Sequence, residues 1–178
     1  MSIKDLAIYL SDYCNKNGIE TVLSGGACVT IYTNNKYMSY DLDFVLLSYV
    51  VPKKIREAMR KVGFQEEGKY FTHKETPYFV EFLQPPLSVG EEPVKEVSKI
   101  KKGNKVLRLL SPTDCVKDRL AAYYHWNDKQ SLEQAILVCE EKTVDLKEVG
   151  RWSKNEGMSK KFEAFKENLE KRKSEVKI

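Results

Sequence analysis

The sequence predicts an α+β fold, in which a mixed β-sheet with flanking helices is followed by a C-terminal helical portion. Strand-like and helix-like segments alternate through the first half of the 178 residues, a pattern typical of a sheet covered by helices. From Ser111-Pro112 onward the pattern is helical throughout. We therefore expect an α/β core over residues 1–110 and a helical portion over residues 111–178.

The first part of the chain predicts alternating helices and strands. Apolar residues at helical spacing mark the first helix, and Gly18 suits its C-terminal end. Residues 26–35 include β-branched residues that resist helix formation. We still expect a short helix there, because the chain must return before the next strand. The expected elements are, in order, a helix over 3–18, a strand over 19–24, a short helix over 26–35, a strand over 40–50 and a helix over 51–64.

A β-rich stretch comes next and ends at a helical region. Turn signals near Thr76-Pro77 and at Gly103-Asn104 predict two strand pairs. Ser111 and Pro112 then have the pattern of an N-cap and a first helical position. The expected strands cover 69–75 and 77–86, a hairpin covers 94–110, and helices cover 111–126, 131–141, 144–155 and 158–173.

Composition limits the class of protein. Hydrophobic residues make up 42% and charged residues 31%, as in globular domains. No apolar run approaches the ~20 residues of a membrane span, and the N-terminus lacks a signal-peptide pattern, so we expect a cytoplasmic protein without a membrane partner. The four cysteines are widely spaced, which favours reduced, mostly buried thiols over a disulfide framework or a zinc site.

The net charge of +4 equals the excess of basic over acidic residues from Lys142 onward. This basic C-terminal tail could contact RNA or an acidic partner. The ordinary alternative is a solvated helix end.

Asp41 and Asp43 stand two residues apart at the start of a strand that continues with apolar residues. In a strand, residues i and i+2 project from the same face about 7 Å apart. Two carboxylates this close repel unless a cation lies between them, and Mg²⁺ or Mn²⁺ accepts such oxygen ligands. The alternative is an exposed strand end that carries two solvated carboxylates.

Two neighbouring features strengthen the prediction of a site. Glu81 lies within an apolar, aromatic strand, where a charge is costly unless it is paired or binds metal; an outward-facing position is the alternative. Gly25-Gly26 follows a strand and precedes the short helix, so backbone N–H groups could approach a polyphosphate. Ser24 or the amide of Gly26 would then hold the terminal phosphates.

These residues together resemble the nucleotidyltransferase superfamily with the DNA polymerase beta-like fold. Its signature is a strand ending in Gly-Gly, a short helix, a strand opening with Asp-x-Asp and a third acid on a later strand. The matching residues here are Gly25-Gly26, Asp41-Leu42-Asp43 and Glu81. More narrowly, the segments 39–45 and 111–126 are similar to small bacterial and archaeal proteins of this kind, including abortive-infection and toxin–antitoxin transferases.

The resemblance implies transfer of a nucleoside monophosphate from an NTP to a hydroxyl of a protein or RNA acceptor, with release of pyrophosphate. Two metal ions would support the displacement. Asp41 and Asp43 would hold both ions. Glu81 would ligate the catalytic ion and help to deprotonate the acceptor.

A basic group for the triphosphate is expected on the helix that begins after Ser111. Lys117 is the candidate, with Tyr124 or His125 near the base, and an exposed lysine on an ordinary helix is the alternative. Arg119 lies about 200° around the helix from Lys117, so the two are not expected to serve one site. His125 and Trp126 fit packing in or beside the core better than chemistry.

Two departures from the family pattern support a second hypothesis. Abortive-infection relatives often carry arginine where this chain has Tyr37, with Lys36 beside it, and the third acid is Glu81 instead of the commoner aspartate. A catalytically impaired module that senses nucleotide or binds a protein, as in a toxin–antitoxin pair, would tolerate both. A third hypothesis is an RNA-binding domain that uses the basic C-terminal helix.

Overall fold

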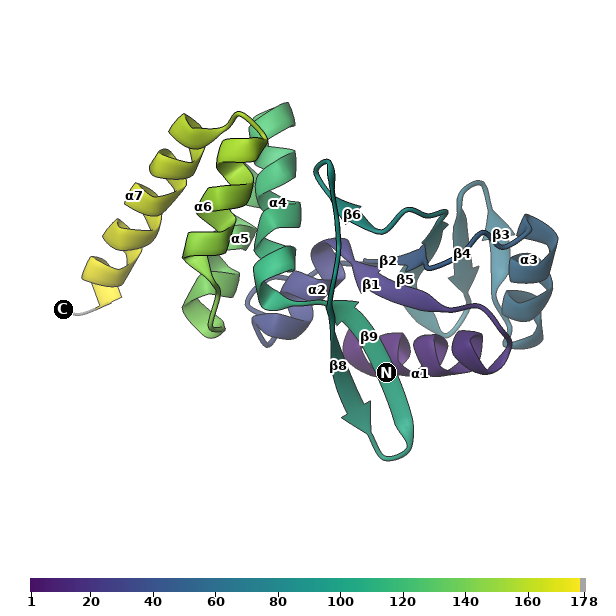
Figure 1. Cartoon of the computed structure of the whole chain (residues 1–178). Helices are drawn as coiled ribbons and strands as arrows, with labels where there is room; N and C mark the ends of the chain where they lie inside the picture. The colour runs from purple at the N-terminus through teal and green to yellow at the C-terminus, as the bar shows by residue number, and fades with distance from the viewer. Residues whose placement is uncertain (177–178) are drawn as a thin grey trace.

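The computed structural model describes residues 1–176 and has a sheet-containing part beside a group of helices (Figure 1). The main sheet has seven strands in the order β3-β4-β5-β2-β1-β9-β8, and β6 and β7 form a separate two-stranded sheet. The strands are β1 (Thr21–Ser24), β2 (Asp41–Leu46), β3 (Gln65–Glu67), β4 (Tyr70–His73), β5 (Thr76–Leu83), β6 (Ser88–Val89), β7 (Glu92–Pro93), β8 (Val97–Lys102) and β9 (Lys105–Leu110).

The centre of the sheet is mixed, as the sequence predicts. β2 runs antiparallel to β1 and parallel to β5, while β9 runs parallel to β1. The carboxyl ends of β1 and β9 and the amino end of β2 therefore meet at one end of the sheet. The helices α2 (Gly25–Tyr32) and α4 (Pro112–Trp126) both start there, so this end joins the two parts of the molecule.

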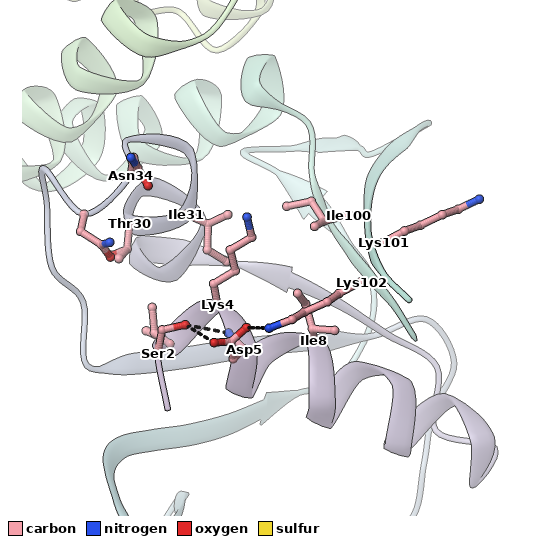
Figure 2. A pocket seen from close by; sticks show the side chains of 12 residues that line it. Ser2, Lys4, Asp5, Ile8, Thr30, Ile31, Asn34, Ile100, Lys101 and Lys102 are labelled. Atoms are coloured by element: carbon pink, nitrogen blue, oxygen red, sulfur yellow. Dashed lines mark hydrogen bonds and ion pairs between the residues drawn. The ribbon is translucent and has the colours of Figure 1, made fainter. Parts of the chain in front are cut away.

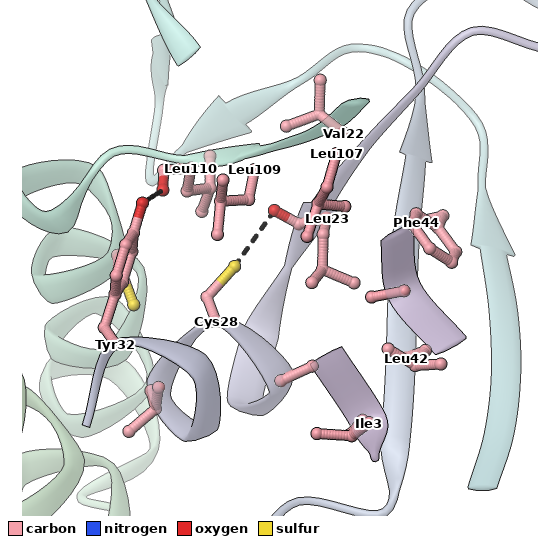
Figure 3. Close-up of a cluster of buried hydrophobic side chains, with 14 of the residues drawn as sticks. Ile3, Val22, Leu23, Cys28, Tyr32, Leu42, Phe44, Leu107, Leu109 and Leu110 are labelled. Carbon is pink, nitrogen blue, oxygen red and sulfur yellow. Dashed lines mark hydrogen bonds between the residues drawn. The ribbon is translucent and has the colours of Figure 1, made fainter. Parts of the chain in front are cut away.

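One face of the central sheet packs against helices to form the core. Along β2, Leu42 and Phe44 point to this face and are fully buried, because side chains alternate along a strand. Ile3 of α1 (Ile3–Lys16) lies beside them (Figure 3). The helix α3 (Pro52–Lys61) is tied to α1 because the Tyr13 hydroxyl donates to the Ala58 carbonyl at 2.8 Å.

The helical part consists of α4, α5 (Lys129–Glu141), α6 (Leu146–Asn155) and α7 (Ser159–Val176). As predicted, Ser111 caps α4, its hydroxyl accepting from the Asp114 N–H at 3.1 Å, and Pro112 occupies the first helical position. The Tyr32 hydroxyl of α2 donates to the Leu110 carbonyl at 2.6 Å (Figure 3). This bond fixes the end of α2 at the start of α4.

Each helix and strand that the sequence predicts occurs, but some strands were missed. β3 is short, polar and exposed, and β6 and β7 have two residues each, so none has an apolar pattern. β2 ends at Leu46, before the predicted end at residue 50. The cysteine thiols are free, as expected. Within residues 1–176, no helix combines the length and apolar character needed to cross a membrane.

Candidate functional site

The register of the sheet gathers the acidic residues on the face opposite Leu42 and Phe44. Asp43 pairs with Glu81 across the parallel strands β2 and β5, and with Ser24 across the antiparallel strands β1 and β2. Directly paired residues point to the same face, and Asp41 shares that face because it lies two positions before Asp43. Glu81 is therefore turned toward the aspartates, as the sequence-based site requires.

Gly25 brings the Asp43 carboxylate against the first turn of α2. Its φ of +68° is a conformation that only glycine adopts readily, and a Cβ there would lie 2.4 Å from Oδ2 of Asp43. A Cβ at Gly26 would lie 3.1 Å from the Ser39 hydroxyl and 3.4 Å from Cε1 of Tyr37. The double glycine thus keeps space for an acid on one side and for Tyr37 on the other.

The N-terminus of α2 has no side-chain cap. Ser24 is its N-cap residue, but its hydroxyl donates to the Asp43 carbonyl at 3.2 Å instead of accepting from the helix. The first N–H groups of a helix have no intrahelical acceptor and favour an anion. A phosphate group could therefore bind at this turn, next to Asp43.

The charge at the site is unbalanced. The pKa of Asp43 is raised from 3.8 to about 6, first by burial and then by the negative charges of Glu81 and Asp41. Glu81 accepts from Lys69 Nζ at 3.2 Å, which is the near cation for that carboxylate. Mutual repulsion of this kind is relieved by a bound cation.

The carboxylates of this site fit a divalent ion whose remaining ligands come from water or substrate. Within residues 1–176, no three His, Cys, Asp or Glu side chains are close enough to hold an ion by themselves. Mg²⁺ needs only one or two carboxylates when waters and substrate phosphates supply the other oxygens. Asp41, Asp43 and Glu81 would supply these carboxylates, one or two to each ion, and water and phosphate oxygens would complete the coordination.

Besides Lys69, Arg119 of α4 is a basic residue near enough for its charge to act on Asp43. Its charge lowers the pKa of Asp43, in opposition to the acids. The guanidinium is 19% exposed and is oriented by neighbours: Nε and Nη2 donate to Asp118 Oδ2 at 3.1 and 2.6 Å, and Nη1 donates to Gln134 at 3.3 Å. A fixed guanidinium is well suited to bind phosphate.

The structure does not bring the other predicted nucleotide-binding residues to the acids. Lys117 is 5% exposed, and its Nζ lies 3.0 Å from Glu148 and 3.4 Å from Asp114, beside a cavity of about 360 Å³. Tyr124 is buried, shares a 2.7 Å hydrogen bond with Ser153 and stacks on Trp152. Both side chains lie on the side of α4 turned away from Arg119.

The structure also places Lys36, His125 and Trp126, which the sequence suggested for nucleotide contacts or for packing. Lys36, next to Tyr37, forms an ion pair with Glu141 of α5. The imidazole of His125 lies 4.0 Å from Glu156. Trp126 does not pack, contrary to the prediction, since 83% of it is exposed.

A cavity of about 370 Å³ lies apart from these residues, between the start of α1, the end of α2 and β8 (Figure 2). Its Asp5 carboxylate already accepts from Ser2 and, at 2.6 Å, from Lys102. The acids of the candidate site do not line it.

Comparisons with known proteins identify the fold. No family model matches the sequence, and no curated protein matches it. A crystal structure of an antigenic nucleotidyltransferase-like protein from Paracoccidioides brasiliensis matches with a TM-score of 0.59 and 12% identity over 76% of this chain and 74% of that one. A solution structure of the antibiotic-resistance factor ANT(2'')-Ia matches with a TM-score of 0.53 and 11% identity over 98% and 100%. The chain therefore has a nucleotidyltransferase-like fold.

Proposed function

We propose that this chain, having a nucleotidyltransferase-like fold, is a metal-dependent nucleotidyltransferase that moves a nucleoside monophosphate from an NTP to a hydroxyl of a protein or RNA. One observation carries the proposal. The Asp43 carboxylate lies against the uncapped first turn of α2 and directly opposite Glu81. An anion-binding turn and a cation-binding pair thus adjoin, which is the arrangement that a metal–triphosphate complex needs.

The chain's own groups would position the triphosphate. The N–H groups of the first turn of α2 would receive phosphate oxygens, and Gly25 permits the close approach. Arg119 would donate to the same phosphates from the side of α4. Asp41, Asp43 and Glu81 would hold Mg²⁺ or Mn²⁺, which would neutralise the negative charge of the phosphates.

In the reaction, the acceptor oxygen forms a bond to the α-phosphorus while the bond to the bridging oxygen breaks and pyrophosphate leaves. Glu81 would accept the acceptor's proton, because it projects from the same face of the sheet as Asp43. Lys69 at 3.2 Å would orient that carboxylate and limit its mobility. Positioning and charge neutralisation supply most of the rate in phosphoryl and nucleotidyl transfer.

A second candidate function is nucleotide sensing or protein binding without transfer, as in one component of a toxin–antitoxin pair. The Lys69–Glu81 ion pair favours it, because a carboxylate oxygen that already accepts from an ammonium group has less free capacity to bind a metal ion. Tyr37 beside Gly26 favours it as well, since tyrosine lacks the charge that would hold a phosphate.

Labelled nucleotides separate the two functions. The protein is incubated with each α-³²P-NTP, Mg²⁺ or Mn²⁺, and protein or RNA fractions of a cell extract. We expect label in one fraction, loss of that label in Asp43→Asn, and retention in Glu75→Gln, which removes an exposed carboxylate from the β4–β5 turn. Nucleotide binding without transfer would support the second candidate, and absence of both binding and transfer would contradict the proposal.

A further inference from the structure

Trp126 is the most exposed large apolar side chain within residues 1–176, at 83%, whereas Trp152 is fully buried. A tryptophan side chain carries a large apolar surface that is normally buried on folding. Single exposed apolar residues are common, so exposure alone does not indicate a function for Trp126. Its position relative to the candidate site is the informative observation.

The helices α2 and α4 run antiparallel, and α4 extends past the start of α2. The C-terminal end of α2 is fixed at the start of α4 by the bond from Tyr32 to Leu110. One turn back along α2, Cys28 neighbours Cys115 of α4. The Asp43 carboxylate, which lies against Gly25 at the start of α2, is near enough to Arg119 for that charge to act on it. The last two turns of α4, which end at Trp126, therefore continue beyond the N-terminus of α2 (Figure 1).

Trp126 and Arg119 lie on the same face of α4. Seven residues correspond to two turns, so the two positions differ by about 20° around the axis and about 10 Å along it. The indole is thus displaced from the guanidinium in the direction that leads away from α2 and into solvent. A nucleotide with its phosphates at Arg119 and at the first turn of α2 could extend its base along this face.

We propose that Trp126 is the platform on which the base of the bound nucleotide stacks. The inference rests on the proposed function, because it takes the phosphates to lie at α2 and Arg119. Stacking on an aromatic ring accepts every base, since each has a π-face. The subsite would therefore add affinity without choosing among the four NTPs.

Tryptophan fluorescence and equilibrium dialysis test this with the full chain, Mn²⁺ and non-hydrolysable analogues of ATP, GTP, CTP and UTP. In the wild type we expect saturable quenching of emission, because the stacked indole is solvent-exposed when free. Trp126→Phe should remove the quenching, since the buried Trp152 that remains lies in the core. Dialysis should show affinity about 10-fold weaker in Trp126→Ala and only slightly weaker in Trp126→Phe, which keeps a ring.

Tyr49→Ala is the matched control, because Tyr49 is also an exposed aromatic residue (67%) but follows β2 at the end away from Asp43. Its affinity for nucleotide should equal that of the wild type. Wild-type binding without quenching, with equal affinity in Trp126→Ala, would overturn the inference and leave the proposed function standing. Absence of nucleotide binding by the wild type in dialysis would overturn both.

Discussion

Gly25 shows how one residue controls the site. A left-handed φ is required there, and the space of the missing Cβ is taken by the Asp43 carboxylate. Strain and steric exclusion therefore act at the same position. They are separable, because Gly68 has a similar φ of +64° with nothing near its absent Cβ.

Gly25→Ala should lose nucleotide affinity at least about 10-fold and stability by about 2 kcal/mol, since the side chain both strains the backbone and displaces Asp43. Gly68→Ala should cost only the backbone strain, about 1 kcal/mol, with unchanged affinity. Urea unfolding and equilibrium dialysis measure the two effects. Equal losses of affinity in both variants would contradict a specific role for Gly25.

The ionised carboxylate of Asp43 should lower the stability of the fold, although the proposed function requires it. Its pKa is raised from 3.8 to about 6 by burial and by Glu81 and Asp41, so between these pH values the folded state binds its proton more tightly than the unfolded state does. The free energy of unfolding therefore falls as pH rises from about 4 to about 6, and stays lower above that range.

Asp43→Asn should accordingly be more stable than the wild type at pH 7.5, by about 1–3 kcal/mol, with little difference near pH 4. Mn²⁺ should stabilise the wild type at pH 7.5 and leave the variant unchanged, because the variant lacks the central carboxylate. Urea unfolding at the two pH values, with and without Mn²⁺, measures this. A variant that is less stable at pH 7.5 would show that the ionised carboxylate stabilises the fold.

At the scale of elements, α4 has two charged faces with different partners. Arg119 faces Asp43 and is braced by Asp118 and Gln134. Lys117, about 200° around the helix, joins Glu148 and Asp114 and links α4 to α6. One face therefore carries the cation near Asp43, and the other links α4 to α6.

Substitution on the two faces should separate binding from stability. Arg119→Gln should weaken NTP binding about 10- to 100-fold, and Arg119→Lys should recover only part of it, because lysine lacks the planar fork. Lys117→Gln should leave affinity unchanged and lower the free energy of unfolding by about 1–3 kcal/mol, since Asp114 loses its cation and Glu148 keeps only Arg151. Dialysis and urea unfolding measure these effects, and the reverse outcome would place the triphosphate on the Lys117 face.

At the scale of the whole molecule, the sheet and the helices share contacts that argue for joint folding. The Trp152 indole of α6 donates to the Val89 carbonyl of β6 at 3.1 Å, and this bond is buried. Residues 1–110 without the later helices would leave the Val89 carbonyl without this donor and the side of α2 that packs on α4 exposed to water.

We expect a single cooperative unfolding transition. Far-UV circular dichroism reports both parts, while the emission of Trp152 in Trp126→Phe reports the junction, and the two urea curves should coincide. Separate midpoints would show that residues 1–110 and 111–178 unfold as independent domains.

The sequence by itself determined the elements and the acidic motif. Periodicity and turn residues are local, so helices, the Gly103-Asn104 hairpin and the cap at Ser111 were predictable, whereas the two-residue strands β6 and β7 carry no period. The alternation of a strand put Asp41 and Asp43 on one face before any fold was known.

Only the tertiary structure decided which distant residues meet. The pairing of β2 with β5 sets Asp43 opposite Glu81, and register depends on packing across the whole sheet. The sequence showed that Lys117 and Arg119 lie on different faces of α4, but the rotation of that helix against α2 brought the charge of Arg119, and not that of Lys117, near Asp43. The same packing left Trp126 in solvent instead of in the core, because α4 is longer than the helix that it covers.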